Sequence, residues 1–400
     1  MAPGGRRAET FAWAGWAAMF AATAAVILHD GSRSVVPAYR IAAGWWMKGM
    51  RLYELSGIGG FTYLPQAAIL YAPLAVLPES VGEVLWRLVS IAAFALALRG
   101  FARLGRRTGD RDLFPLAALV AIPLVWDCAR NGQATLIMTA FMLLAVTDIA
   151  RRRWWRATLW LALGVAIKPL AVVLVLLVAA VDRPMTWRAI VGMAVLAMVP
   201  FLTQHAAYVV EQYRACLENM TISAHVGAVA HGWTSPFTAL RVAGVDVPEG
   251  VQTILRLAAA AATLVLCFVA RQRFDADRSA VFVYSLAALY LILFSPRTEN
   301  NTYTMLAPSI GVFLAAAFLS ERAVGGGVLL AGIALALAAS RGIERLVAPH
   351  AEQVWLSPLL ASCFALYLLV RLLTGSVDAG RPGGGCCSNG SCGPAIPGDP

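Results

Sequence analysis

Residues 11–28 read FAWAGWAAMFAATAAVIL, a stretch of eighteen positions without a charged side chain. About 20 apolar residues in a helix are enough to cross the roughly 30 Å hydrocarbon core of a membrane. No small-residue cleavage site followed by soluble sequence comes after this stretch, so we interpret it as a retained first span rather than a signal peptide. Similar stretches recur along the chain, and together they predict an all-α polytopic membrane protein.

The composition supports this class. Hydrophobic residues make up 60% of the chain and charged residues 14%, with a mean hydropathy of +0.70, which excludes an ordinary soluble protein. The net charge of +10 comes largely from basic residues in short segments between the apolar stretches. Such a distribution is typical of membrane topology signals. Since no nucleic-acid motif is present, we expect no nucleic-acid partner.

Ten candidate spans follow from the apolar runs. Two further apolar stretches are interrupted: residues 63–78 carry three prolines, and residues 157–181 are broken at Lys168-Pro169. The pattern predicts a bundle of about 10–13 transmembrane or half-membrane helices within residues 1–375. Residues 376–400 are predicted to be a disordered Gly/Pro/Cys-rich tail. The candidate spans are 9–28, 82–101, 113–130, 132–150, 189–203, 251–270, 279–295, 303–320, 325–340 and 355–373.

The basic residues predict the orientation in the cytoplasmic membrane. One set of loops, together with both termini, carries 19 of the 32 Lys and Arg residues, and the opposite loops carry 10. The excess places the first set, with the N-terminus and the tail, in the cytoplasm. This topology requires 63–78 to enter from outside and return, and 157–181 to form two half-helices from inside. The alternative is that 63–78 crosses fully.

The predicted topology gathers four polar segments on the external face, at residues 29–62, 131–133, 203–250 and 296–302. Three carboxylates in these segments are candidates for a general base, namely Asp30, Glu54 and Glu299. A general base must sit at a cavity and reach the hydroxyl that it deprotonates. Asp30 directly follows the first span, so the alternative is that it only marks the end of a helix.

Three cations are candidates for binding a phosphate: Arg40, Lys168 and Arg297. Basic residues on the external side do not serve orientation, and guanidinium groups suit phosphate oxygens. Lys168 lies inside an apolar stretch, where a charge is costly and is functional by default. The alternatives for Lys168 are snorkelling and a buried ion pair.

Seven polar side chains in the same segments are candidates for binding substrate. Asn131-Gly132 also fits a helix cap, and Asp127 and Arg130 are spaced to form an ion pair. The aromatic residues of the 29–62 loop also fit interface anchors. The substrate-binding candidates are Tyr39, Tyr63, Asn131, Gln133, His231, Asn300 and Tyr303.

Several standard sites are missing from the sequence. It contains no P-loop, no G-x-G-x-x-G after a strand and no G-x-S-x-G. The histidines lack the spacing of a zinc site, although a metal or proton-transfer role for His225 and His231 remains open. We therefore expect no required cofactor, while a divalent metal is compatible with the sequence. The tail cysteines Cys386, Cys387 and Cys392 have no role that the sequence identifies.

The order of several short motifs resembles glycosyltransferase family 87. The motifs are Tyr39-Arg40-x-Ala42-Ala43, Gly49-x-x-Leu52-Tyr53, Phe61-x-Tyr63-x-Pro65, Pro73-Leu74, Leu77-Pro78, Trp86, Asn131-Gly132-Gln133, Gly164-x-x-x-Lys168-Pro169 and Ser295-Pro296 followed by Tyr303. The resemblance covers residues 10 to 375. It implies a GT-C fold and transfer of a sugar, typically mannose, from a polyprenyl-phosphate donor to an acceptor outside the cytoplasmic membrane, with inversion.

The resemblance also implies an acidic base a few positions before Tyr39-Arg40, and here the chain departs from the family. Residues 33–38 contain no carboxylate, and the nearest acids are Asp30 and Glu54. Either one of these has the role, or Glu299 has it, or activity is altered. We expect a lipid-linked sugar donor, a lipid or glycan acceptor and membrane lipids as partners. The rival interpretations are a transporter or lipid flippase, which would show two similar halves and charges at mid-span, and an inactive family member.

Overall fold

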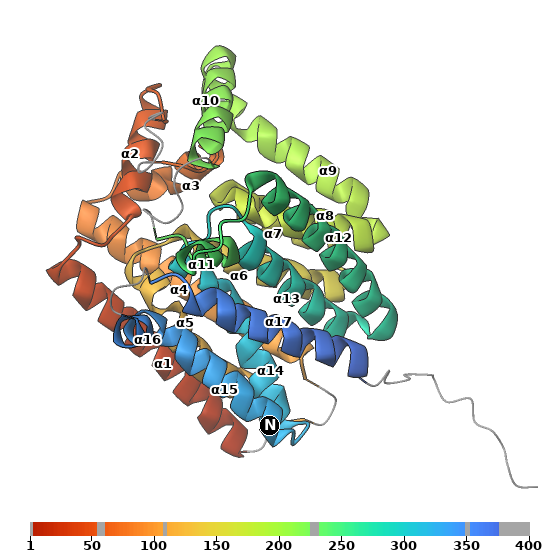
Figure 1. Ribbon diagram of the computed structural model, residues 1–400. Coiled ribbons are helices and arrows are strands. Elements are labelled where there is room, and N and C mark those ends of the chain that lie inside the picture. The colour runs from red at the N-terminus through yellow and green to blue at the C-terminus, as the bar shows by residue number, and fades with distance from the viewer. Residues whose placement is uncertain (1–2, 54–60, 107–109, 225–231, 349–352, 376–400) are drawn as a thin grey trace, which may run out of the picture.

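A computed structural model describes residues 3–53, 61–106, 110–224, 232–348 and 353–375. Within these ranges the chain is all-α, with seventeen α-helices, three 3₁₀ helices and no strand, as predicted (Figure 1). The α-helices are α1 Pro3–His29, α2 Val36–Met47, α3 Pro65–Ala75, α4 Glu79–Leu104, α5 Phe114–Arg130, α6 Ala134–Ala150, α7 Trp154–Ile167, α8 Val172–Val181, α9 Arg183–Met198, α10 Ala206–Ala224, α11 Pro236–Val242, α12 Glu249–Arg273, α13 Ala276–Phe294, α14 Ala307–Leu319, α15 Val324–Ala338, α16 Ser340–Val347 and α17 Leu356–Thr374. The 3₁₀ helices are η1 Pro169–Ala171, η2 Val199–Leu202 and η3 Asn300–Leu306.

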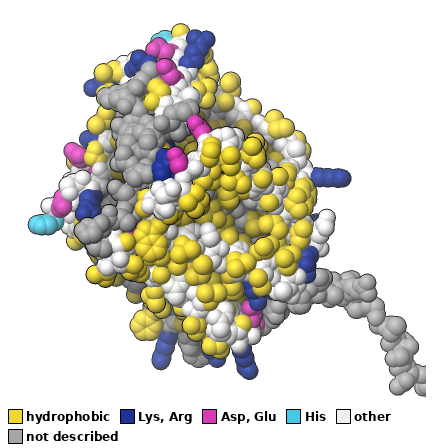
Figure 2. All heavy atoms as spheres, viewed as in Figure 1, with side chains coloured by type: hydrophobic (Ala, Val, Ile, Leu, Met, Phe, Trp, Pro, Cys, Tyr) yellow, Lys and Arg dark blue, Asp and Glu magenta, His cyan; other side chains and the backbone are white. Residues whose placement is uncertain are grey.

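The described helices include seven that are long and apolar enough to cross a membrane. A bent pair, α15 and α16, adds one broken segment with an angle of 78° between its parts, and three shorter apolar segments lie at 134–150, 154–167 and 169–181. This set falls within the 10–13 membrane or half-membrane helices that the sequence predicted. Figure 2 shows a broad apolar surface across the middle of the molecule, with most Lys and Arg side chains near its borders.

Ion pairs gather the arginine-rich loops at one end of the bundle, which we call the basic end. Arg99 at the end of α4 pairs with Glu9 near the start of α1. Arg271 at the end of α12 pairs with Asp182, which follows α8, at 3.1 Å. Arg153, in the loop after α6, pairs with Asp148 of α6, and Glu321, after α14, pairs with Arg371 of α17. Segments that the charge distribution assigned to one side of the membrane therefore do lie together.

The opposite end, which we call the Tyr39 end, carries α2, α3 and α10 (Figure 1). With 11 residues, α3 is about 16 Å long, which is too short to cross the hydrocarbon core. Both of its flanks contact the first turns of α2: the Tyr63 hydroxyl is 3.3 Å from that of Tyr39, and the Leu77 carbonyl accepts a hydrogen bond from Arg40 at 2.8 Å. The segment 63–78 thus returns to the end from which it starts, as predicted.

The break at Lys168-Pro169 is also present. Proline removes a backbone donor, and its ring disfavours a helical conformation at the preceding residue, so α7 ends at Ile167 and Lys168 adopts an extended backbone (φ −151°, ψ 118°). The chain then turns through η1 into α8, which runs back to the Arg271–Asp182 contact at the basic end. The pair α7 and α8 is therefore a hairpin of short helices with Lys168 at its apex.

A glycine turn joins α5 to α6 at the Tyr39 end. Gly132 has a φ of +67°, a left-handed conformation that favours glycine. A Cβ at this position would lie 2.4 Å from Val36 Cγ2, because the start of α2 packs directly on the turn. The turn is held from two sides: Trp86 Nε1 donates to the Gly132 carbonyl at 2.8 Å, and the Val35 N–H donates to the Asn131 carbonyl at 3.0 Å.

Replacing Gly132 with alanine should therefore destabilise the protein more than the same change at Gly49. Gly49 has the same φ of +67°, but nothing lies within 4 Å of the position that a Cβ would take there, so Gly49→Ala carries only the backbone cost of about 1–2 kcal/mol. Gly132→Ala adds an overpacking cost of about 1–3 kcal/mol. Thermal unfolding of the two purified variants measures the difference. Equal unfolding midpoints would show that a Cβ at position 132 does not disturb the packing of the turn against α2.

Candidate functional site

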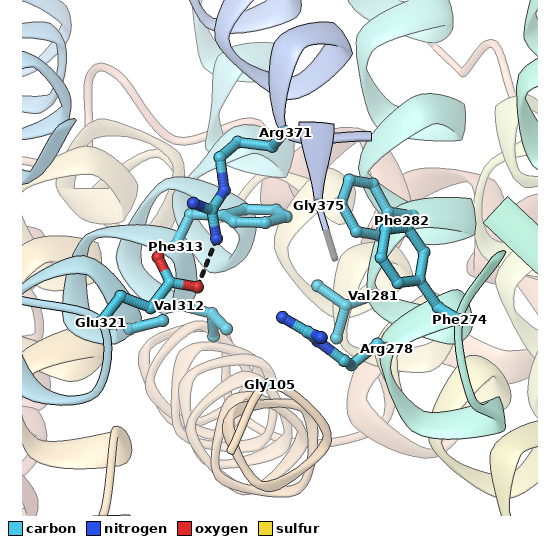
Figure 3. Close-up of a pocket in the computed structure, with 11 residues that line it drawn as sticks. Gly105, Phe274, Arg278, Val281, Phe282, Val312, Phe313, Glu321, Arg371 and Gly375 are labelled. Carbon is cyan, nitrogen blue, oxygen red and sulfur yellow. Dashed lines mark hydrogen bonds and ion pairs between the residues drawn. The ribbon is translucent and has the colours of Figure 1, made fainter. Parts of the chain in front are cut away.

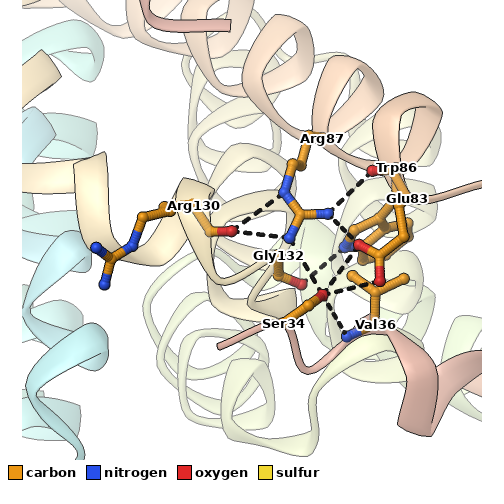
Figure 4. Close-up of polar contacts among 7 residues, drawn as sticks. All are labelled: Ser34, Val36, Glu83, Trp86, Arg87, Arg130 and Gly132. Carbon is orange, nitrogen blue, oxygen red and sulfur yellow. Dashed lines mark hydrogen bonds and ion pairs between the residues drawn. The ribbon is translucent and has the colours of Figure 1, made fainter. Parts of the chain in front are cut away.

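A buried arginine links three segments at the Tyr39 end. Arg87 of α4 is 1% exposed and forms an ion pair with Glu83, one helical turn earlier. Its Nε and Nη2 donate to the Arg130 carbonyl at 3.1 and 2.8 Å, and Nη2 also donates to the Ser34 hydroxyl at 3.2 Å (Figure 4). A buried charge is tolerated only when it is paired and hydrogen-bonded. Arg87 therefore holds the ends of α4 and α5 and the loop after α1 in fixed positions.

Tyr39 connects α2 to the start of α6. Its side chain is 5% exposed, and its hydroxyl accepts a hydrogen bond from the Ala134 N–H at 3.1 Å. The same oxygen lies 3.3 Å from the Tyr63 hydroxyl. The Tyr39 ring packs edge-on against Trp86. Two of the predicted substrate-binding residues, Tyr39 and Tyr63, are thus in direct contact.

The predicted convergence of the 29–62 and 203–250 segments is present in their described parts. Trp46 Nε1 donates to the Thr203 hydroxyl at 3.2 Å, and Gln204 Nε2 donates to the Trp46 carbonyl at 2.6 Å. Tyr208 of α10 donates its hydroxyl to the Met50 carbonyl at 2.6 Å. These hydrogen bonds fix the position of α10 relative to α2.

The 203–250 segment is joined in turn to the 295–303 segment. The Thr234 N–H donates to the Thr298 carbonyl at 2.7 Å, and the Tyr303 hydroxyl donates to the Thr234 carbonyl at 2.7 Å. The Arg297 guanidinium lies 5.3 Å from the centre of the Trp233 ring. Tyr303 and Arg297 therefore both have partners within the protein, and their interactions hold the 203–250 segment against the 295–303 segment.

A polar cluster lies between these segments. Lys168, at the apex of the α7–α8 hairpin, donates to the hydroxyl of Thr135 in the first turn of α6 at 2.8 Å. Cys128, near the end of α5, is within electrostatic range of Lys168, Glu299 and Tyr39. We call these five residues the Lys168–Glu299 cluster. It combines a cation and a carboxylate from segments that are 131 positions apart (299 minus 168).

The described carboxylates among the predicted bases differ in environment. Glu299 is half-buried, and within the described ranges its carboxylate has neither a hydrogen bond nor an ion pair. Asp30 is exposed and accepts a hydrogen bond from the Ser32 N–H at 2.9 Å, which is the main reason why its pKa lies below its usual value. A carboxylate with a lowered pKa is a weaker base. Asp30 is therefore the weaker of the two candidates, and the role of Glu299 stays a prediction.

The arginines and amides near the α5–α6 turn have structural partners. Arg40 Nη1 donates to the Leu77 carbonyl. Arg130 pairs with Asp127 at 3.6 Å, as its spacing predicted, and its Nε donates to Asn131 Oδ1 at 3.4 Å. These contacts support the capping interpretation of the turn and leave the proposed ligand roles of Arg40 and Asn131 as predictions.

The other predicted site residues fall into two groups. Gln133 is 8% exposed at the start of α6, and Asn300 Oδ1 accepts a hydrogen bond from the Ser357 hydroxyl at 3.0 Å. Glu54 and His231 lie outside the described residues, as do His225 and the tail cysteines. Their predicted roles are therefore not tested by the structure.

Sequence reasoning missed three of the residues that organise this end. Arg87 had no role predicted from the sequence, although Glu83 four positions earlier was the available signal for its ion pair. Cys128 and Thr135 carried no such signal, because Thr135 matters through its hydrogen bond with Lys168, and Cys128 lies within electrostatic range of Lys168 and Glu299, which are distant in sequence. Among the described residues, no group of three or more His, Cys, Asp or Glu side chains is arranged to hold a metal ion.

A second polar feature lies at the basic end and serves a different purpose. A small cavity of about 40 Å³ is lined by Arg371, Glu321, Arg278 and several phenylalanines, with Arg371 paired to Glu321 (Figure 3). Phe274 and Phe282 stack there with ring centres 4.8 Å apart. The cavity is too small for a sugar and lies at the end opposite to the Lys168–Glu299 cluster, so we interpret it as a packing contact.

Comparison of the sequence with known proteins identifies the family. The sequence profile of glycosyltransferase family 87 matches residues 61–296, more than half of the chain. The matched region contains Cys128, Thr135 and Lys168 and ends three residues before Glu299. A polyprenol-phosphate-mannose-dependent α-(1-2)-phosphatidylinositol pentamannoside mannosyltransferase from Mycobacterium tuberculosis is 28% identical over 264 residues. That match covers 62% of this chain and 57% of the mycobacterial protein. The chain is thus a multi-pass membrane protein that belongs to glycosyltransferase family 87.

Proposed function

We propose that the chain transfers a sugar, specifically mannose, from a polyprenyl-phosphate donor to an acceptor hydroxyl. The observation that carries the proposal is that Lys168, which donates to Thr135, and Glu299 both lie within electrostatic range of Cys128 at one end of the bundle. A cation suited to a phosphate, at the same end as a carboxylate that has no hydrogen bond or ion pair to another described residue, suits a reaction in which a phosphate leaves while a hydroxyl loses its proton. Family membership supports the reaction class, and the mycobacterial relative supports mannose and a glycolipid acceptor.

Lys168 is the residue that binds the donor phosphate. Its ammonium sits at the apex of two short helices and is held by only one side-chain hydrogen bond, to Thr135, in the described structure. An ammonium has three donors, so two remain for phosphate oxygens. When the bond between the anomeric carbon and the phosphate oxygen breaks, the charge that develops on the phosphate is stabilised by this fixed cation.

Glu299 is the general base of the same step. Its carboxylate takes the proton of the acceptor hydroxyl as that oxygen attacks the anomeric carbon, and polyprenyl phosphate leaves from the opposite face. A single displacement of this kind inverts the configuration of the anomeric carbon. The reaction needs no nucleotide, and the residues assigned to it need no metal ion.

The Tyr39 end faces away from the cytoplasm in this proposal. Support comes from the excess of basic residues in the loops that the structure gathers at the basic end. Cytoplasmic loops carry such an excess because basic residues orient insertion. The sugar donor therefore reaches the site from the outer leaflet of the cytoplasmic membrane.

Lys168→Met should weaken donor binding by about 10- to 100-fold. The reason is that a hydrogen bond to a charged group contributes about 1.5–3 kcal/mol, and 1.4 kcal/mol corresponds to a factor of ten. The measurement is the Kd for radiolabelled polyprenyl-phosphate mannose, together with sugar transfer, using protein in lipid nanodiscs.

The matched control is Lys48→Met, because the sequence contains two lysines and Lys48 is exposed at the end of α2. It should leave the donor Kd unchanged. Equal donor binding by both variants and the wild type would remove Lys168 from the site. Absence of transfer, combined with passage of a solute across liposomes, would replace the transferase proposal with a transporter.

A further inference from the structure

Two tryptophans and an arginine lie together at the basic end, where α7 and α9 begin. The chain runs through α7 to Lys168 and returns through α8, so α7 and α9 start at the same end of the bundle. Trp155 lies in the first turn of α7 and Trp187 at the start of the second turn of α9, and their rings meet edge-on with centres 5.2 Å apart. The Arg188 guanidinium lies 4.4 Å from the centre of the Trp187 ring and 5.6 Å from that of Trp155. We call these three residues the Trp155–Arg188 surface.

The two helices that carry this surface are packed tightly against each other. A Cβ at Gly192 would clash with the side chain of Thr158, so α9 lies directly on α7 about one turn beyond the tryptophans. Arg188 is held further by a hydrogen bond from its Nη1 to the Pro184 carbonyl at 2.6 Å. A guanidinium over an aromatic face is also attracted to the ring. The Arg188 cation is therefore presented from rigid elements and in a fixed orientation.

No carboxylate of the described residues neutralises this cation. The neighbouring acid, Asp182, forms its ion pair with Arg271 at 3.1 Å. Arg183, one helical turn before Trp187, is exposed and likewise forms no ion pair within the described ranges. Residues four positions apart on a helix are neighbours on its surface. Arg183 and Arg188 therefore add two uncompensated positive charges to one small area, and guanidinium groups suit phosphate oxygens.

The surface continues into an apolar strip that faces outward. Leu159, four positions after Trp155, is 53% exposed, and Ile190 and Val195 of α9 are 67% and 60% exposed. Since α9 is apolar and long enough to cross a membrane together with η2, these side chains are placed to contact lipid chains. Tryptophan is enriched where the hydrocarbon meets the head groups. The two half-exposed indoles thus place the Arg188 guanidinium at the level of the lipid phosphates.

We propose that the Trp155–Arg188 surface binds an anionic phospholipid from the membrane leaflet at the basic end. The phosphate lies against the guanidinium groups of Arg188 and Arg183, and the acyl chains lie along the apolar strip of α7 and α9. Basic sites between membrane helices suit anionic head groups, because each cation near the membrane surface adds attraction. The surface lies at the end opposite to Lys168, so the proposal does not depend on the proposed transferase function.

The test compares two lipids that have the same acyl chains. Dioleoyl phosphatidylglycerol has a net negative charge, whereas the choline of dioleoyl phosphatidylcholine compensates its own phosphate. Binding to the full chain in neutral detergent micelles is measured by native mass spectrometry and by the rise of the thermal unfolding midpoint with lipid concentration. We expect phosphatidylglycerol to bind about tenfold more tightly or better, because two uncompensated arginines attract only the lipid with a net charge.

Arg188→Gln should weaken phosphatidylglycerol binding by about tenfold and leave phosphatidylcholine binding unchanged. Arg188→Lys should recover part of the loss, since it keeps the charge but lacks the planar group that stacks on the indole. The matched control is Arg103→Gln. Arg103 is exposed in the last turn of α4, at the same end of the bundle, so this variant removes the same charge without touching the two tryptophans. It should leave the preference for phosphatidylglycerol unchanged.

Two results would overturn the proposal. One is equal binding of the two lipids by the wild type, and the other is an equal loss in Arg188→Gln and Arg103→Gln, which would reduce the arginines to a general surface charge. Thermal unfolding without added lipid checks that Arg188→Gln is folded. If it is not, Arg183→Gln decides, because Arg183 is exposed and has no ion pair to lose within the described ranges. The same weakening of phosphatidylglycerol binding is expected there, and unchanged binding would refute the site.

Discussion

Replacing Glu299 with glutamine should reduce sugar transfer by about 10²- to 10⁴-fold, the usual contribution of a general base. The amide keeps the size and hydrogen-bonding shape of the side chain but does not accept the proton of the attacking hydroxyl. Because Glu299 has no hydrogen bond or ion pair to lose within the described structure, the substitution should leave folding intact. The measurement is the initial rate of transfer from radiolabelled polyprenyl-phosphate mannose, with the donor Kd measured separately.

Donor binding by Glu299→Gln should equal that of the wild type, since the proposed mechanism assigns the phosphate to Lys168. Asp30→Asn is the matched control. Its carboxylate is exposed, and the hydrogen bond from the Ser32 N–H lowers its pKa below the usual value, which makes it a weaker base. Transfer that survives in Glu299→Gln and fails in Asp30→Asn, or in a parallel Glu54→Gln variant, would move the base to the 29–62 loop.

Arg87→Met should destabilise the protein by about 3–5 kcal/mol, because removing one partner of a buried ion pair leaves the other charge buried and uncompensated. The substitution leaves the Glu83 carboxylate without its ion-pair partner, and the Arg130 carbonyl without the two hydrogen bonds that Arg87 donates. Equilibrium unfolding in mixed detergent micelles, or the thermal midpoint, measures the loss.

The double variant Glu83→Leu with Arg87→Met separates charge from packing. Removing both charges should recover part of the stability, because replacing a buried pair by apolar residues is often close to neutral. Arg130→Met is a milder comparison, since the Arg130 side chain pairs with a partly exposed Asp127. A loss for Arg87→Met no larger than that for Arg130→Met would mean that the network does not hold this end together.

Much of the architecture could be predicted from the sequence because the signals are local. The apolar runs gave the all-α membrane class, and the proline after Lys168 predicted the break that divides α7 from α8. The distribution of basic residues predicted which loops lie together, and the ion pair of Arg271 with Asp182 is one result. The short α3 was foreseen from its prolines and from the parity of the spans.

The site could be predicted only in outline, because it is built from long-range contacts. Lys168 and Glu299 were candidates from their residue types, but their placement within electrostatic range of Cys128 depends on the packing of α5, α6 and η3. The partners of Arg87 include a backbone carbonyl 43 positions away, and a carbonyl has no sequence signature. A cavity of about 200 Å³, lined by Asn301 and Arg341 among others, depends on the bend between α15 and α16, and no residue type in the sequence predicts that bend.

The length of the α7–α8 hairpin sets the depth of Lys168 within the helix bundle. Its apex brings the ammonium of Lys168 level with the first turn of α6, so a donor lipid can dock its head while its isoprenoid tail stays in the hydrocarbon. In the proposed reaction the polyprenyl phosphate then leaves in the plane of the bilayer, without being lifted into water. Lengthening α7 and α8 by one helical turn each would move the Lys168 ammonium by about 5.4 Å along the bundle, away from the first turn of α6.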